Sequence, residues 1–180
     1  MQLKKLFLMV KKKLLIITSL DDLKSIYQIL DKNFIINYKK NISKPEIYKI
    51  IHKYDAIYTN PNNSKIFFDK LLLNKSKKLK VICTASTGTT HIDLEEAKNK
   101  KIKIISIKEK RREINKITST SEHALALTLN SLRMLHTSHN SVLNNKWDYE
   151  KFIGRQLNSL NFGILGYGRL GKNYARYIFS

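Results

Sequence analysis

The chain has 180 residues, of which 42% are apolar, and a formal net charge of +20 that comes from 34 Lys and Arg against 14 Asp and Glu. The length suits one domain, or one domain and part of a second, and the apolar fraction excludes a disordered chain. The single cysteine excludes a disulfide framework and a cysteine-based zinc site, and it suits a reducing cytosol.

No segment of the sequence predicts membrane insertion. No apolar run approaches the ~20 residues that a membrane span needs. The apolar segment 6–10 is followed by lysines at 11–13 and lacks a small-residue cleavage site, so it does not resemble a secretory signal peptide. Met1 and Met9 are alternative starts. We therefore expect a cytoplasmic protein without a membrane partner.

The positive charge suggests nucleic-acid binding, because a basic surface displaces the counterions of phosphates. The makeup of the charge argues against that interpretation: 28 of the 34 basic residues are Lys, six are Arg, and residues 1–80 contain no Arg. Base-edge readout and phosphate clamping favour the planar fork of Arg, whereas scattered Lys residues usually form a solvated surface. We expect no nucleic-acid partner, and nucleic-acid association is the less favoured alternative.

The first hundred residues alternate short β-branched runs with segments of helical periodicity, a pattern typical of a parallel α/β sheet. Ser43 and Glu46 have the spacing of a capping box at one helix start. Phe67, Leu71 and Leu72 are expected to face inward from another helix. Strands are predicted over 13–18, 34–38, 55–59, 79–84 and 103–107, and helices over 21–32, 44–53, 64–75 and 93–100.

A charged loop over 108–116 is interpreted as a domain boundary. Ser119 and Glu122 then have capping-box spacing ahead of a long helical pattern over 120–145. Such a helix would span ~40 Å and suits an element that connects two lobes. An apolar strand is predicted over 160–165, followed by a glycine-rich turn and a helix that runs to the last residue.

Hydroxyl side chains, a glycine and consecutive backbone amides make up the loop 86–91, which follows the fourth predicted strand. In an open parallel sheet the loops at the carboxyl ends of the strands form the ligand crevice, and a nest of amides can hold a small carboxylate. The alternative is a hydroxyl-rich turn that caps the helix beginning at Asp93. His91 and Asp93 do not by themselves make a catalytic dyad, so a surface or capping role is expected for both.

A second motif, GxGxxG, is formed by Gly166, Gly168 and Gly171 between the last predicted strand and the last helix. The first glycine permits a tight turn, the second lets a pyrophosphate approach the backbone, and the third allows close packing of helix on strand. The alternative is a glycine-rich turn without a ligand. The acidic residue that would bind the ribose is expected ~20 positions later, beyond Ser180.

Few other residues carry chemistry. The five histidines show no metal spacing with a third ligand, so no metal site is expected. Cys83 falls inside a predicted strand and is expected to be a buried small hydrophobe. Nothing resembles a nucleophile elbow or a P-loop lysine.

Four segments occur in a fixed order: STGTTHID at 86–93, TSEHALAL at 120–127 together with Arg133, Trp147, and FGILGYGRLG at 162–171. Together they resemble the D-isomer-specific 2-hydroxyacid dehydrogenases, a family that includes phosphoglycerate dehydrogenase. The resemblance runs from about residue 80 to the end, and the α/β pattern of residues 10–80 is consistent with it. It implies a flavodoxin-like substrate-binding domain over 10–110, an interdomain helix over 117–146 and, over 147–180, the first strand and helix of a Rossmann NAD-binding domain.

The resemblance also implies an NAD-dependent oxidoreductase that transfers a hydride between nicotinamide and C2 of a 2-hydroxy or 2-keto acid. In the family a backbone loop faces the substrate carboxylate, and backbone amides of the glycine-rich turn bind the pyrophosphate. The matching substrate-binding positions here are Ser86, Thr87, Gly88, Thr89 and Asn60. The matching cofactor-binding positions are Thr120, Gly166, Tyr167, Gly168, Arg169, Leu170 and Gly171.

The sequence departs from the family in what it lacks. The catalytic Arg, Glu and His of family members follow the stretch present here, so we assign no catalytic residue, regard the chain as the N-terminal portion of a longer enzyme and expect it to be inactive alone. A full-length member is expected to form a homodimer. Thr90 stands where Asn or Asp is frequent, and Ser121 where Ala is usual. The alternative function is a non-catalytic remnant that binds a small acid.

Overall fold

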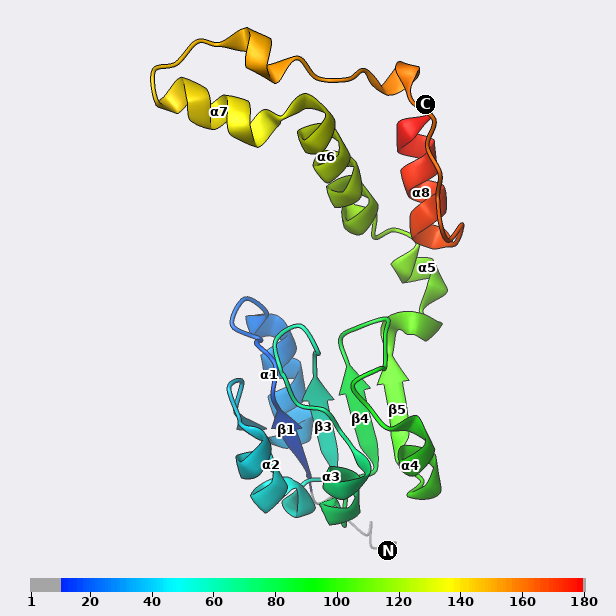
Figure 1. Ribbon diagram of the computed structural model, residues 1–180. Coiled ribbons are helices and arrows are strands. Elements are labelled where there is room, and N and C mark those ends of the chain that lie inside the picture. The colour runs from blue at the N-terminus through cyan, green and yellow to red at the C-terminus, as the bar shows by residue number, and fades with distance from the viewer. Residues whose placement is uncertain (1–10, 180) are drawn as a thin grey trace, which may run out of the picture. The chain divides into compact units, whose positions relative to one another are not determined.

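The chain divides into two compact units in a computed structural model that describes residues 11–179 (Figure 1). The first unit ends at Lys110 and the second begins at Arg111. The segment 6–10 and the alternative start Met9 lie outside the described residues. Across the described part of the chain, no helix combines the length and the apolar character needed to cross a membrane.

A five-stranded parallel sheet forms the first unit, in the order β2-β1-β3-β4-β5. This is the flavodoxin-like order, in which the direction of winding reverses between β1 and β3. The expected α/β class and flavodoxin-like sheet are therefore confirmed. The strands are β1 (Lys12–Ile16), β2 (Phe34–Tyr38), β3 (Ala56–Thr59), β4 (Val81–Thr84) and β5 (Lys103–Ser106).

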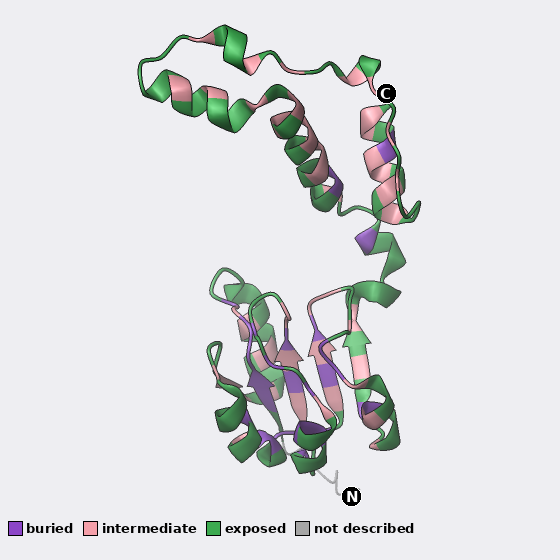
Figure 2. Cartoon of the chain, in the orientation of Figure 1, coloured by how far each residue is buried: buried purple, intermediate pink, exposed green. Residues whose placement is uncertain are grey.

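β1 is buried on both faces from Leu14 to Ile16, whereas β3 and β4 alternate fully buried residues with half-buried ones (Figure 2). Leu15, Ile57 and Ile82 are fully buried and pair in register across β1, β3 and β4. They belong to a core shared with α2 (Lys44–Ile50), α3 (Lys70–Lys75) and α4 (Leu94–Asn99). Leu14 and Ile16 face the other side, where α1 (Lys24–Asn33) covers them.

Side chains cap three of these helices. Ser43 accepts a hydrogen bond from the backbone N–H of Glu46, and the Glu46 carboxylate accepts one from the backbone N–H of Ser43, so the predicted capping box is confirmed. Asp69 caps α3 and Asp93 caps α4 in the same manner. The 3₁₀ turn Ile51–Lys53 completes the second predicted helix.

The predicted helix over 64–75 is wrong in its first half. Phe68 forms a parallel bridge with Ile92: its N–H donates to the His91 carbonyl at 2.8 Å, and its carbonyl accepts from the Asp93 N–H at 3.0 Å. This pairing between distant segments delays the helix to Lys70 and shifts its apolar face. Consequently Phe68, Leu72 and Leu73 are buried, while Phe67 and Leu71, which were expected inward, are exposed.

Helices dominate the second unit, which contains α5 (Arg111–Ile114), α6 (Ser119–Arg133), α7 (Leu135–Leu143) and α8 (Arg169–Ile178). The helix predicted over 120–145 is broken at Met134, whose left-handed backbone (φ 51°, ψ 37°) ends α6. The predicted capping box at Ser119 is also wrong, because the N-cap is Thr118 and makes no side-chain hydrogen bond.

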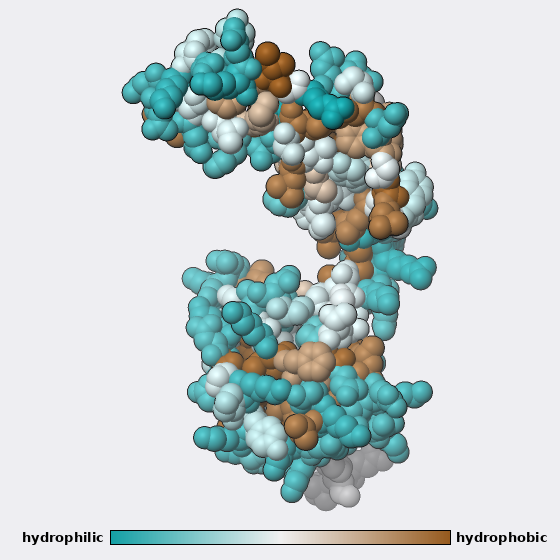
Figure 3. Space-filling view, viewed as in Figure 1, coloured by the Kyte–Doolittle hydropathy of each residue, from teal (hydrophilic) through white to brown (hydrophobic). Residues whose placement is uncertain are grey.

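The strand predicted over 160–165 is not formed, and within residues 111–179 the structure contains no strand. Leu165 is fully exposed, and apolar side chains lie on the surface of this unit (Figure 3). A strand in a sheet needs neighbours to pair with its backbone groups, and this segment has none among the described residues. Instead, this unit is held together by the packing of α6 against α8, where the Thr128 hydroxyl lies 2.7 Å from the Tyr174 hydroxyl.

Candidate functional site

Buried threonines mark the carboxyl edge of the sheet. Thr18 follows β1, while Thr59 and Thr84 end β3 and β4 and pair in register. Because all the strands run parallel, the loops that follow them meet at this edge, where ligands bind in open α/β sheets. Asn60 and the loop 86–91, which we call the candidate substrate loop, both begin here.

Ser86 shapes the candidate substrate loop from within. Its hydroxyl donates to the Gly88 carbonyl at 2.7 Å and lies 2.8 Å from the Thr84 hydroxyl. The Ser86 carbonyl accepts from the N–H of Ile107, which ties the loop to the end of β5. The Thr89 carbonyl accepts from the N–H of Ile92 at 3.0 Å and fixes the far end of the loop.

The backbone N–H groups of Thr87, Gly88 and Thr89 donate no hydrogen bond to any residue within 11–179. Thr87 and Gly88 are exposed, and a Cβ atom built on Gly88 would meet nothing within 4 Å. No acidic side chain occurs between residues 84 and 92. The loop thus offers consecutive free donors without a negative charge beside them, a chemistry that suits a small carboxylate.

His91 is buried, contrary to the surface role expected for it, and the residue is only 8% exposed. Its Nε2 lies 3.1 Å from the Thr84 hydroxyl, while its Nδ1 has no hydrogen-bond partner among the described residues. Burial disfavours the charged imidazolium and lowers the pKa of His91 below its ordinary value. Asp93 instead takes the expected capping role, accepting from the Glu96 N–H at 2.9 Å.

Asn60 lies on the same edge but uses its side-chain oxygen locally. Its Oδ1 accepts from the N–H of Asn62 at 3.0 Å, and its carbonyl accepts from the N–H groups of Asn63 and Ser64. The turn is joined to β1 because the Thr18 hydroxyl donates to Asn63 Oδ1 at 3.0 Å. In this turn Asn60 therefore has its amide nitrogen left for a ligand.

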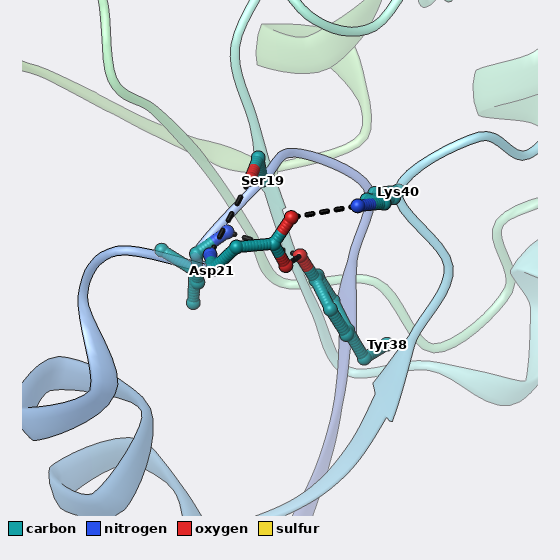
Figure 4. Close-up of polar contacts among 5 residues, drawn as sticks. Ser19, Asp21, Tyr38 and Lys40 are labelled. Atoms are coloured by element: carbon teal, nitrogen blue, oxygen red, sulfur yellow. Dashed lines mark hydrogen bonds and ion pairs between the residues drawn. The ribbon is translucent and has the colours of Figure 1, made fainter.

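An ionic cluster at the ends of β1 and β2 has no counterpart in the sequence-based predictions (Figure 4). The Asp21 carboxylate accepts from Lys40 Nζ at 2.6 Å and from the Tyr38 hydroxyl at 2.8 Å, and these bonds lower the pKa of Asp21 to about 2. Tyr38 in turn accepts from the Leu20 N–H. The cluster anchors the segment after β1, and only the strand pairing brings its members together.

The glycine-rich turn, residues 166–171, depends on glycine at two positions. Gly166 has φ +95°, a conformation that side chains rarely adopt, and a Cβ on Gly171 would lie 2.1 Å from the Gly166 carbonyl oxygen. Around Gly168, the N-cap of α8, nothing lies within 4 Å of a Cβ position. The N–H groups of Arg169, Leu170 and Gly171 make no hydrogen bond within the described chain, so the turn fits a diphosphate.

Side-chain contacts hold this turn against the start of α6. The Arg169 guanidinium donates to the carbonyls of Ile114 and Ile117, and the Ser121 hydroxyl donates to the Leu170 carbonyl at 3.1 Å. Thr120 precedes Ser121 in the same helical turn. Because the Arg169 side chain is used in this way, its backbone N–H is the group left for a ligand.

Basic side chains border the same turn. A pocket of about 440 Å³ lies along the first turns of α8, and its charged side chains are all cationic. Tyr167 is exposed, with Lys172 Nζ 5.9 Å from the centre of its ring. A positive pocket beside free helix amides favours an anionic ligand. The pocket is lined by Asn115, Gly168, Arg169, Lys172, Asn173 and Arg176.

Other chemistry-bearing groups do not assemble into a site. Across the residues that the structure describes, no cluster of three or more metal-ligating side chains occurs. Cys83 is only half-buried rather than fully buried, and burial raises the pKa of its thiol. A thiol with a raised pKa is a weaker nucleophile at neutral pH.

Comparison with known protein families matches both parts of the chain. The catalytic domain of the D-isomer specific 2-hydroxyacid dehydrogenases matches residues 14–139. The NAD binding domain of the same family matches residues 125–179.

Curated relatives include D-3-phosphoglycerate dehydrogenases. That of Archaeoglobus fulgidus is 30% identical over 141 residues, which cover 78% of this chain and 25% of that protein. That of Bacillus subtilis is 27% identical over 148 residues, covering 82% of this chain and 26% of that protein. The chain thus spans about a quarter of the length of these relatives.

Solved structures show the same fold. D-lactate dehydrogenase from Aquifex aeolicus, complexed with NAD and lactic acid, is 28% identical with a TM-score of 0.75, covering 93% of this chain and 48% of that chain. A glyoxylate reductase from Paecilomyes thermophila has a TM-score of 0.80 at 22% identity, covering 95% and 53%, and supports the fold alone.

Proposed function

This chain belongs to the D-isomer specific 2-hydroxyacid dehydrogenase family. From that membership we propose that it is part of an NAD-dependent oxidoreductase that acts at C2 of a 2-hydroxy or 2-keto acid. The observation that carries the proposal is the set of free N–H groups at Thr87, Gly88 and Thr89, at the carboxyl edge of the sheet. Residues 10–110 are then the substrate-binding domain, and the candidate substrate loop receives the carboxylate.

Substrate binding rests on hydrogen bonds rather than on a charged side chain. The Ser86 hydroxyl, by binding the Gly88 carbonyl, keeps that acceptor occupied while the neighbouring N–H groups stay free. A carboxylate can accept several such bonds, each of which is stronger than a neutral hydrogen bond. The Asn60 amide nitrogen on the adjacent loop is a further donor for the same acid.

Residues 117–146 are proposed as the interdomain segment and residues 147–180 as the start of the NAD-binding domain. The N–H groups of Arg169 and Leu170 would hold the pyrophosphate, and the Gly166, Gly168 and Gly171 backbone would allow its approach. Thr120 would lie toward the nicotinamide and Tyr167 beside the pyrophosphate. NAD, when bound, supplies the hydride acceptor or donor.

In this proposal the chain binds and orients the substrate and the pyrophosphate of NAD. The one histidine of the candidate substrate loop, His91, is buried, and its Nε2 is engaged with the Thr84 hydroxyl, so we give it no part in proton transfer to a ligand. We therefore assign proton transfer to no residue of the chain and expect no turnover from the chain alone. In a full-length enzyme, a homodimer is the expected assembly.

Nuclear magnetic resonance on the ¹⁵N-labelled 180-residue chain tests this proposal. Titration with pyruvate, a simple 2-keto acid, should shift the amide signals of Thr87, Gly88 and Thr89, and titration with NAD⁺ should shift those of Arg169 and Leu170. NADH should not be oxidised steadily in the presence of pyruvate. Binding of neither molecule at these amides would refute the proposed function, and sustained turnover would refute the assignment of catalysis to other residues.

A further inference from the structure

Thr84 lies at the centre of a hydrogen-bonded chain that reaches the candidate substrate loop from the sheet. Its hydroxyl contacts both Ser86 Oγ, at 2.8 Å, and His91 Nε2, at 3.1 Å. Thr84 is 1% exposed and His91 is 8% exposed, so water does not compete freely for these bonds. Ser86 continues the chain to the Gly88 carbonyl at 2.7 Å.

Counting protons fixes the direction of every bond. Ser86 has one hydroxyl hydrogen, which it donates to the Gly88 carbonyl, so Ser86 Oγ must accept from Thr84. Thr84 then has no hydrogen left and must accept from His91 Nε2. The neutral imidazole therefore carries its hydrogen on Nε2 and a lone pair on Nδ1, which has no hydrogen-bond partner among the described residues.

The opposite tautomer breaks the chain of hydrogen bonds. With the hydrogen on Nδ1, the Nε2 atom would accept from Thr84, whose single hydrogen would then be withdrawn from Ser86. The Ser86 hydroxyl could not serve both Thr84 and the Gly88 carbonyl, and a buried Nδ1–H would have no acceptor among residues 11–179. Because Nδ1 lacks a partner in either tautomer, the preference comes from the hydrogen bond among Thr84, Ser86 and Gly88 that the opposite tautomer loses, and a typical hydrogen bond contributes ~0.5–1.5 kcal/mol.

We propose that His91 is a positioning residue for the candidate substrate loop, which it orders through the one-way chain His91 to Thr84 to Ser86 to Gly88. The proposal rests on the proposed function, because it explains how the loop is prepared for a carboxylate. The chain of hydrogen bonds keeps the Gly88 carbonyl turned toward Ser86, so that the acceptor does not face the bound anion. His91 itself does not touch the substrate.

The tautomer can be read directly in the ligand-free protein. Long-range ¹H–¹⁵N correlation spectra of the full ¹⁵N-labelled chain at neutral pH should show the His91 ring protonated on Nε2 and bare on Nδ1. The variant His91→Gln, which loses this signal, assigns it among the five histidines. An Nδ1–H tautomer, or rapid exchange between the two tautomers, would overturn the proposal.

Matched substitutions test whether these hydrogen bonds prepare the loop. Thr84→Val keeps the buried shape but removes the hydroxyl, while Thr84→Ser keeps the hydroxyl. His91→Leu removes the N–H that donates to Thr84, while His91→Gln keeps an N–H at a similar distance from the backbone. The dissociation constant of pyruvate, measured from the Gly88 amide signal, should rise about tenfold in Thr84→Val and His91→Leu and change less than about twofold in the conservative pair.

The outcomes separate the inference from the proposed function. If the unmodified chain binds pyruvate at the loop and all four variants bind it equally well, with the signals of Leu15 and Ile57 unchanged, His91 does not position the loop. If the unmodified chain shows no shift at the loop, the proposed function fails, whatever the tautomer. Should Thr84→Val not fold, the comparison of His91→Leu with His91→Gln decides between the same two outcomes.

Discussion

The two units of this chain treat their apolar side chains differently. In the first unit Leu15, Ile57 and Ile82 are fully buried between paired strands, whereas Leu165 in the second unit is fully exposed on a segment without a paired neighbour among the described residues. The strands of the first unit and the segment around Leu165 all have strand-like sequences. An apolar run therefore becomes a buried strand only where neighbouring strands pair with it and helices cover it.

Core truncation should give the largest contrast between the units. Ile82→Ala removes fully buried methyl groups and is expected to reduce the free energy of unfolding of the first unit by ~2–5 kcal/mol. The matched change Leu165→Ala, at a fully exposed position, should alter stability by less than ~0.5 kcal/mol. Amide hydrogen exchange in β3 and α8 measures each unit separately. Equal losses would break the contrast.

The glycine-rich turn is the exception that should make the second unit sensitive. Gly171→Ala places a Cβ 2.1 Å from the Gly166 carbonyl oxygen and should cost ~1–3 kcal/mol in the exchange of α8 amides. Gly163→Ala, where nothing lies within 4 Å, is the control and should cost less than ~1 kcal/mol. A well-tolerated Gly171→Ala would show that the turn is not held as described.

Helix caps provide a smaller contrast. Ser43→Ala breaks a capping box in the first unit and should destabilise it by ~1 kcal/mol. Thr118→Ala changes the N-cap of α6, which makes no side-chain hydrogen bond, and should cost less than ~0.5 kcal/mol. Urea unfolding of both variants, followed by circular dichroism, measures the difference. A larger loss from Thr118→Ala would contradict the cap assignments.

The smallest expected effect is the loss of stability at low pH. Because Lys40 and Tyr38 lower the pKa of Asp21 from 3.8 to about 2, the carboxylate stabilises the fold above pH ~4, and that contribution disappears as pH falls through 2. A ¹³C titration of the Asp21 carboxyl should have a midpoint near 2, and Lys40→Met should raise it. An unchanged midpoint in Lys40→Met would mean that the ion pair is not formed in solution.

Local sequence patterns were sufficient to predict the strands of the sheet. They were insufficient to predict structure that depends on contacts between distant segments. The strand over 34–38 was predicted with its observed bounds, and the capping box of Ser43 and Glu46 is a local signal that the structure confirms. The bridge between Phe68 and Ile92 joins residues far apart in the sequence and overrides the helical pattern of 64–69. No periodicity predicts the left-handed Met134 that divides α6 from α7.

The candidate site divides in the same way. The loop 86–91 and the glycine-rich turn could be identified from residue types and spacing, since both rely on backbone groups and glycine. The burial of His91 and its contact with Thr84 could not, because they depend on how the loop folds back over the end of β4. The Asp21 cluster likewise depends on the pairing of β1 with β2.

The central claim is that free backbone amides of the candidate substrate loop recognise the carboxylate of a 2-keto acid. Its most direct test is a pair of titrations of the ¹⁵N-labelled chain, one with pyruvate and one with pyruvamide, in which a neutral amide replaces the carboxylate. We predict a saturable shift of the Thr87, Gly88 and Thr89 amide signals with pyruvate and little change with pyruvamide. Equal shifts with both molecules, or none with pyruvate, would contradict the claim.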